Sequence, residues 1–313
     1  MNVGELFAGI GGIGLAFKQA GFDIGWANEI DKKAYITYGK NFNNYAVNED
    51  MKKVNPVKMG QVDVLAGGFP CQSFSIAGYM KGFEDDRGNL FFDILRFVDI
   101  LRPSIIFLEN VKNLMSHDCG RTFKIIQGEL SNAGYYIKHQ VLNTAEYSDI
   151  PQHRERLYIV CFRHKKHYEK FRFPKPIKKT KSIRSLLESN VPEEFSYKNS
   201  RYYPRLKETM INPNTLYQWR RTYVRENKKG LCPTLTANMG TGGHNVPLVL
   251  DGDDIRKLTP RECARLQGFP DDFVLPDDLS NSELYKQIGN SVSVPVVQAI
   301  AKNIKKVLDI NLK

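Results

Sequence analysis

The first half of the chain alternates short apolar runs with stretches of helical periodicity, and this alternation restricts the fold more than any other feature. In Asn89–Leu101, for example, the apolar residues recur every three to four positions and predict a helix. Predicted strands are Val3–Phe7, Phe22–Ala27, Val62–Ala66, Ser104–Leu108, Tyr135–Leu142 and Leu157–Phe162; further predicted helices are Ile13–Ala20 and Ser293–Leu308. Strands that alternate with helices indicate an α/β fold with a mainly parallel sheet covered by helices.

Length and composition predict a globular protein with one large domain or two unequal ones. The chain has 313 residues, of which 42% are hydrophobic and 25% charged, so extended disorder is not expected. From about Phe173 the sequence becomes rich in Pro, Asn and Tyr, which predicts a second, irregular domain. No apolar run approaches the roughly 18 residues of a membrane helix, and no signal peptide precedes Glu5, so we expect a cytoplasmic protein.

The five cysteines predict neither a disulfide framework nor a zinc site. Their number is odd and none belongs to a C-x-x-C pair. Cys71 follows a predicted strand, and open α/β sheets carry their catalytic and binding residues at the carboxyl ends of strands. The other four, Cys119, Cys161, Cys232 and Cys263, are interpreted as small buried apolar residues.

Basic residues are concentrated in one segment of the chain. Residues 151–230 contain 21 basic and 7 acidic side chains, a surplus of 14 positive charges that exceeds the +11 of the whole chain. The aromatic residues interleaved with these charges are Tyr197, Tyr202, Tyr203, Tyr217, Trp219 and Tyr223. A basic segment with aromatics favours a polyanionic ligand, most simply nucleic acid, over a merely soluble surface.

A glycine-rich turn lies between the first predicted strand and the first predicted helix. Residues Gly9–Gly14 match G-x-G-x-x-G, and Glu29 follows Gly9 by 20 residues, where a carboxylate accepts hydrogen bonds from ribose hydroxyls. The pattern indicates a nucleoside cofactor. By itself it does not distinguish a dinucleotide from S-adenosylmethionine.

Polar residues lie at the ends of three later strands. Cys71 comes after Val62–Ala66 and is preceded by Pro70, and Glu109 ends the strand that begins at Ser104. A cysteine with a lowered pKa serves as a nucleophile, and a buried carboxyl group exchanges protons with a base edge. Arg154 and Arg156 precede the predicted strand Leu157–Phe162 and alternate in an extended segment, so we expect them to share a face and to bind a carboxylate, a phosphate or a base oxygen.

In these residues the chain resembles the DNA (cytosine-5)-methyltransferases, specifically the bacterial restriction–modification type. The resemblance runs nearly end to end and keeps the order of six motifs. They are Glu5–Gly12, Gly68–Gln72, Glu109–Val111, Gln152–Arg156, Arg261–Pro270 and Gln287–Val292. Thr234–Ala237 is similar to the family element that ends the recognition region.

The resemblance implies a two-domain organisation. Residues 1–172 and 285–313 would form the catalytic domain, a Rossmann-like S-adenosylmethionine-dependent methyltransferase sheet with helices on both faces. Residues 173–284 would form a smaller, irregular DNA-recognition domain that reads sequence in the major groove. The loop 72–88, which contains several glycines, would be a lid that closes on DNA.

The resemblance also implies residue roles and a reaction. Cys71 would attack C6 of a flipped cytosine, Glu109 would contact N3 and the amino group, and Arg154 and Arg156 would hold the base and orient the site. Implied contacts to S-adenosylmethionine are Phe7, Gly9, Ile10, Gly11, Gly12, Glu29, Asp50, Pro70, Leu90, Asn290 and Val292. Glu29 would bind the ribose and Asp50 the adenine. Because Ile30 stands where relatives often have an aromatic, no stacking is expected there.

The implied activity is sequence-specific methylation of C5 in double-stranded DNA by a monomer. It would protect DNA from a partner restriction endonuclease without a stable complex. One alternative is a tRNA cytosine-5 methyltransferase of the same fold family, although the intact Pro70–Ser75 motif favours DNA. A second is an inactive DNA-binding relative, which retention of Cys71 and Glu109 disfavours. A third, an NAD-dependent oxidoreductase, does not account for the paired arginines.

Overall fold

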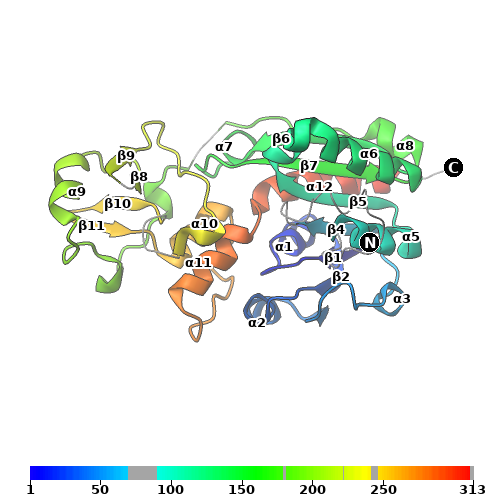
Figure 1. Ribbon diagram of the computed structural model, residues 1–313, viewed down its shortest axis with the longest axis horizontal. Helices are drawn as coiled ribbons and strands as arrows, with labels where there is room; N and C mark the ends of the chain where they lie inside the picture. The colour runs from blue at the N-terminus through cyan, green and yellow to red at the C-terminus, as the bar shows by residue number, and fades with distance from the viewer. Residues whose placement is uncertain (70–89, 179–180, 221, 241–245, 311–313) are drawn as a thin grey trace. The chain divides into compact units, whose positions relative to one another are not determined.

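The computed structural model describes residues 1–69, 90–178, 181–220, 222–240 and 246–310. The chain divides into two compact units (Figure 1). The first contains Met1–Leu142, Glu155–Lys175 and Pro295–Lys313, and the second contains Asn143–Arg154 and Pro176–Val294. Within the described ranges, no helix has both the length and the apolar character needed to cross a membrane.

The first unit is built on a seven-stranded sheet in the order β3-β2-β1-β4-β5-β7-β6. The strands are β1 (Asn2–Leu6), β2 (Asp23–Asn28), β3 (Tyr45–Val47), β4 (Val64–Gly68), β5 (Ile105–Val111), β6 (Tyr136–Asn143) and β7 (Glu155–Phe162). Pairing is parallel from β3 to β5, whereas β7 runs antiparallel to β5. The predicted mainly parallel sheet is confirmed, and each predicted strand lies within three residues of its expected ends.

Helices cover both faces of this sheet. They are α1 (Gly12–Gln19), α2 (Lys32–Asn41), α3 (Pro56–Met59), α5 (Leu90–Leu101), α6 (Arg121–Asn132), α8 (Lys165–Lys170) and most of α12 (Val294–Leu308). Ile106 of β5 packs in one cluster with apolar residues of α5 and α6. The next residue, Phe107, points to the other face, where its ring meets Phe17 of α1 at 5.4 Å between centroids. Both faces are therefore buried, as an apolar parallel strand requires.

The C-terminal helix confirms its predicted apolar stripe. Val296, Val297, Ile300, Ile304 and Val307 are all at most 4% exposed. From Pro295 onward the helix belongs to the first unit. The cysteine interpretation holds in part, because Cys161, Cys232 and Cys263 are buried but Cys119 is exposed.

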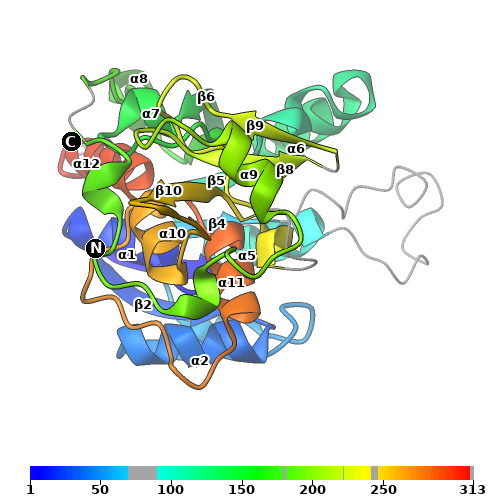
Figure 2. The same ribbon diagram turned by 90° about the vertical axis from the view of Figure 1, so that its left-hand side faces the viewer.

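The second unit contains a four-stranded sheet that the sequence pattern did not predict. Its order is β11-β10-β8-β9, with antiparallel pairing throughout. The elements are β8 (Tyr217–Arg220), β9 (Tyr223–Glu226), β10 (Leu248–Asp251), β11 (Asp254–Lys257), α7 (Thr144–Tyr147), α9 (Tyr203–Thr209), α10 (Pro260–Gln267) and α11 (Asn281–Asn290). Figures 1 and 2 show α9 beside β8 and β9. Strands of four residues are too short for alternation to stand out from a loop.

Two of the aromatics in the basic segment form the core of this sheet. Tyr217 is fully buried and Trp219 is 8% exposed, and both pack with Leu206 and Met210. The ring centroids of Tyr202 and Trp219 lie 4.5 Å apart. The interpretation of these aromatics as part of a nucleic-acid surface is therefore wrong for Tyr217 and Trp219, because they supply the core that a small sheet needs.

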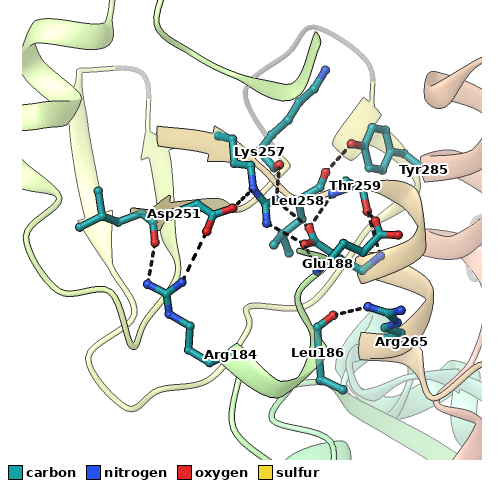
Figure 3. A network of polar contacts seen from close by, with 12 residues as sticks. Arg184, Leu186, Glu188, Asp251, Lys257, Leu258, Thr259, Arg265 and Tyr285 are labelled. Carbon is teal, nitrogen blue, oxygen red and sulfur yellow. Dashed lines mark hydrogen bonds and ion pairs between the residues drawn. The ribbon is translucent and has the colours of Figure 1, made fainter. Parts of the chain in front are cut away.

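A buried ion-pair network joins β10, β11 and α10 in the second unit (Figure 3). Arg256 donates to both carboxylate oxygens of Glu262, at 2.9 and 2.8 Å, and its Nε donates to Asp251 at 2.6 Å. Arg184 adds a second cation beside Asp251. The Glu262 side chain is fully buried and also accepts from the backbone N–H groups of Thr259 and Glu188. Every oxygen of this carboxylate is therefore hydrogen-bonded, which offsets its desolvation.

We predict that Glu262→Ala destabilises the second unit strongly. The substitution leaves Arg256 buried without its main partner, and loss of one member of a buried pair costs about 3–5 kcal/mol. Urea unfolding measures the change. Asp271→Ala is the matched control, because it breaks the exposed Arg265–Asp271 pair and should cost about 1 kcal/mol or less. Equal losses in the two variants would contradict this account of the network.

Candidate active site

The glycine-rich turn follows β1 and exposes its backbone at Gly9. Phe7, Gly9 and Gly11 have positive φ angles of 53°, 56° and 86°. No described atom lies within 4 Å of a Cβ built on Gly9, so the backbone there faces open space. At Gly11 the same Cβ would stand 2.3 Å from the ring of Phe42. Glycine is therefore required at Gly11 by packing, and at Gly9 it leaves room for a ligand to approach the main chain.

Glu29 lies beside this turn, as its spacing predicted. Its carboxylate accepts from the backbone N–H of Gly9 at 2.6 Å and of Asp31 at 2.7 Å. Burial raises the pKa of Glu29 above its ordinary value, although these N–H groups act in the opposite direction. The neighbouring Ile30 is 62% exposed. Glu29 thus places a carboxylate next to the open Gly9 backbone, and the residue that follows it is an exposed apolar one.

Asp50 and Leu90 lie at the ends of neighbouring elements in the same unit. Asp50 follows β3, which pairs with β2 through Asn28 and Val47. Leu90 is the first residue of α5. Burial raises the pKa of Asp93, in the first turn of α5, and the charge of Asp50 contributes in the same direction. Asp50 therefore lies close enough to the start of α5 for the two carboxylates to repel each other.

Glu109 and Arg156 form an ion pair at the ends of β5 and β7. Arg156 Nε lies 3.1 Å from Glu109 Oε1, and the two side chains are 13% and 10% exposed. The antiparallel register pairs Val111 with Arg156, which puts the two charged residues on adjoining strands. Gly68 is the parallel partner of Glu109 on β4, and a Cβ on Gly68 would stand 3.4 Å from Glu109 Oε2. A glycine at this position leaves space next to the carboxylate.

Asn110 fixes the chain just before the Pro-Cys motif. Its side-chain amide is buried and donates to the carbonyl oxygen of Phe69 at 2.8 Å. Phe69 precedes Cys71 by two residues. Pro70, Cys71 and the predicted lid 72–88 lie outside the described residues, so their predicted roles stay predictions. Asn110 lies within the Glu109–Val111 motif, and the sequence predicted no role for it.

Glu5 is a functional candidate that the sequence analysis missed. It lies in the middle of β1, is fully buried, and accepts from the backbone N–H of Gly14 at 3.0 Å. Its other oxygen has no hydrogen-bond partner among the described residues. A Cβ on Gly14 would stand 2.5 Å from that oxygen. The sequence signal for it was an acidic residue inside an apolar strand. The Glu5 carboxylate holds the glycine-rich turn through its hydrogen bond with Gly14.

Arg154 and Arg156 belong to different units and have different partners. Arg154 is 2% exposed, and its guanidinium donates to the carbonyl oxygens of Leu235, Gly289 and Ser291. A Cβ on Gly289 would stand 2.2 Å from the Thr236 carbonyl. Arg154 therefore holds the Thr234–Ala237 element against the end of α11, within the second unit.

Gln152 belongs to the same cluster. Its amide group donates to the Leu266 carbonyl at 2.6 Å and accepts from the Leu235 N–H at 3.3 Å. Asn290 ends α11 and is exposed, and Val292 is 5% exposed. Their implied contacts with the cofactor stay predictions.

Residues 1–306 match the family described as C-5 cytosine-specific DNA methylase. The chain belongs to this family. It is 53% identical to Type II methyltransferase M.Bsp6I of Bacillus sp. (strain RFL6), over 98% of this chain and 99% of that protein. It is 39% identical to Type II methyltransferase M.HhaI of Haemophilus parahaemolyticus, over 96% of this chain and 93% of that protein. The chain is therefore a DNA (cytosine-5-)-methyltransferase, and the predicted family is confirmed.

Solved structures confirm the predicted methyltransferase fold. The Dnmt2 methyltransferase of S. pombe superposes with a TM-score of 0.78 at 21% identity, over 99% of this chain and 100% of that one. EhMeth of Entamoeba histolytica gives 0.76 at 21% identity, over 99% of each chain. At this level of identity the likeness concerns the fold alone.

The methyl donor of the family, S-adenosylmethionine, fits the first unit. Enzymes of this family and fold use it, so the chain takes it as cofactor. The open backbone over Gly9 and the carboxylate of Glu29 beside it suit a nucleoside. Membership of the family, rather than this geometry, decides between S-adenosylmethionine and a dinucleotide.

We predict that Glu5→Gln changes the pH dependence of stability. Burial raises the pKa of Glu5 from 4.5 to about 8, so the folded wild type holds a proton that the unfolded chain has lost between these values. Its stability relative to the glutamine variant should therefore fall as the pH rises from 4.5 to about 8, and should be constant above. Unfolding in urea at pH 5, 6.5 and 8.5 measures the difference.

Glu49→Gln is the matched control for this experiment, because Glu49 is an exposed carboxylate of the same unit. A stability difference between wild type and Glu5→Gln that does not change with pH would show that Glu5 is ionised when buried.

Proposed function

We propose that the enzyme methylates C5 of a cytosine that is flipped out of one short double-stranded DNA sequence. The observation that supports this best is the edge of the first sheet, where Gly9, Gly68 and Glu109 follow or end neighbouring parallel strands. A nucleoside cradle and a carboxylate-arginine pair thus belong to one sheet. Gly68, the last residue of β4, precedes Cys71 by three residues. Cytosine C5 is inside the duplex stack, so flipping costs a few kcal/mol.

Cys71 is the proposed nucleophile. Its thiolate adds to C6, and the electron pair of the C5–C6 bond then makes C5 nucleophilic enough to take a methyl group. S-adenosylmethionine supplies that methyl group from its sulfonium centre. Loss of the C5 proton to a base then expels the thiolate by β-elimination and restores the ring. Asn110 supports this step by fixing the Phe69 carbonyl just upstream of Cys71.

Glu109 and Arg156 are proposed to bind the base. Glu109 would contact N3 and the exocyclic amino group, where charge develops when C6 is attacked. Arg156 holds the Glu109 carboxylate from the adjoining strand at 3.1 Å, so it acts as a positioning residue as well as a base contact. For Arg154 we propose a positioning role in the second unit, because its guanidinium binds three backbone carbonyls there.

The cofactor residues keep the roles that the family resemblance implied. Phe7, Gly9, Ile10, Gly11 and Gly12 form the cradle, Glu29 would bind the ribose and Asp50 the adenine. The other proposed contacts are Pro70, Leu90, Asn290 and Val292. Ile30, which is 62% exposed, would offer the adenine an aliphatic contact in place of an aromatic stack.

The basic residues between 151 and 230 are proposed to bind phosphates of DNA, and residues 173–284 to form the recognition domain. A monomer would protect host DNA from a separate restriction endonuclease. Two relatives are named as Type II methyltransferases, which supports this biological role. The alternative, a tRNA cytosine-5 methyltransferase of the same fold family, receives no support from the names of these relatives.

We predict that Cys71→Ala abolishes methyl transfer but leaves binding of S-adenosylmethionine and DNA within a few-fold of wild type. Without the thiolate, C5 is too weak a nucleophile for the sulfonium methyl. Transfer of labelled methyl to unmethylated plasmid and a gel-shift titration measure the two properties. Cys119→Ala, which changes an exposed cysteine of the same unit, should keep full transfer. Production of 5-methylcytosine by Cys71→Ala would refute the assignment of the nucleophile.

We predict that Glu109→Gln lowers kcat by about 100- to 1,000-fold, the usual effect of removing one group that stabilises transition-state charge. The amide keeps the size of the side chain, but unlike a carboxyl group it cannot transfer a proton to N3 of the cytosine. Single-turnover kinetics on saturating DNA should therefore show a slow chemical step with little change in Kd. A loss confined to DNA affinity would instead make Glu109 a binding residue only.

A further inference from the structure

One face of the β8–β9 hairpin carries two exposed arginines and an exposed tyrosine. The register pairs Gln218 with Arg225 and Arg220 with Tyr223, so these four side chains share one face of the two-stranded ribbon. The other face holds Tyr217, Trp219 and Val224, which pack in the core. Arg220, Tyr223 and Arg225 are exposed, and Tyr223 is 55% exposed.

The two arginines on this face differ in their partners from three arginines that form ion pairs inside the unit. Arg184, Arg256 and Arg265 are each paired with an aspartate or glutamate inside the unit. Among the described residues, Arg220 and Arg225 have no ion pair, and neither do Lys228 and Lys229 just after β9. Four cations without an ion pair in the described part of the unit favour a polyanion on this face.

One of the two arginines is also held in place. Arg220 Nη2 donates to the side-chain oxygen of Gln218 at 3.2 Å, and Gln218 is only 7% exposed. A buried amide thus restrains one edge of the guanidinium. This restraint reduces the side-chain entropy that is lost when a ligand binds.

We propose that this face of β8–β9 reads base edges in the major groove of DNA, with Arg220 and Arg225 binding guanines and with Lys228 and Lys229 binding phosphates. The inference rests on the proposed function, since it names the residues that select the methylated sequence. β9 is the edge strand of its sheet, and the major groove admits a two-stranded ribbon. Arginine matches O6 and N7 of guanine with two hydrogen bonds.

The positions of the two arginines fit this role. Arg220 and Arg225 are diagonal neighbours across the hairpin, which separates such residues by about 7–8 Å. Successive bases are about 3.4 Å apart along a strand, so the two side chains reach base pairs about two steps apart. A competing explanation is that charges on an edge strand only prevent strand-to-strand aggregation.

The test measures discrimination rather than affinity. The target of the wild type is first mapped on plasmid DNA, and Kd is then measured for the target duplex and for duplexes with one base pair changed at each position. Arg220→Gln and Arg225→Gln should each lower the preference at one G·C position by about 5- to 150-fold, the value of one bidentate base contact. Lys228→Gln and Lys229→Gln are the matched variants. Each should weaken binding to all duplexes alike and reduce the salt dependence by about one unit of slope.

Three outcomes would overturn the inference. The first is unchanged discrimination in both arginine variants, which would leave only the aggregation role. The second is a uniform loss of affinity at every position, which would make the arginines phosphate contacts. The third is a wild type that modifies tRNA in preference to DNA. A wild type without any transfer to DNA would refute the proposed function itself, and it is distinguished from the first two outcomes because no target could then be mapped.

Discussion

Parallel pairing of β1, β4 and β5 is the interaction on which the rest of the first unit depends. Leu6 pairs with Gly67, and Gly68 pairs with Glu109, so segments separated by more than 40 residues end at one edge. Each strand contributes a different group there. β1 leads into a turn that exposes the main chain at Gly9, β4 ends in two glycines, and β5 contributes the Glu109 carboxylate. Glycine on β4 is part of this arrangement, since a Cβ on Gly68 would contact the Glu109 carboxylate.

Buried polar side chains then fix the loops that these strands begin. Glu5 holds Gly14 at the start of α1, Asn110 holds Phe69, and Arg154 holds three carbonyls in the second unit. Each replaces water at main-chain groups that a tight loop leaves without a partner. Glu5, Asn110 and Arg154, which lie in motifs of the family, are therefore structural in their contacts. Among the described residues, the Glu109–Arg156 pair and the open backbone at Gly9 remain available to a ligand.

The sequence predicted the parts of this structure whose periodicity is long or whose spacing is characteristic. The helix over Ser293–Leu308 and the meeting of Gly9 with Glu29 are of this kind. The sequence-based prediction failed where tertiary packing determines whether a residue is buried or belongs to a strand. Four-residue strands such as β8 lack enough alternation, and Trp219 resembles a surface aromatic until the core around it is known. Arg154 and Arg156 look equivalent two residues apart, yet Arg156 lies in β7 and pairs with Glu109, whereas Arg154 precedes β7 and binds backbone carbonyls of the second unit.

The most direct test of the central claim is incubation of the purified wild type with unmethylated plasmid and S-adenosylmethionine, followed by mapping of 5-methylcytosine at single-base resolution. The account predicts methylation of one cytosine within a single short motif, at every copy on the plasmid. Absence of 5-methylcytosine from DNA, with a mark on tRNA under the same conditions, would contradict it.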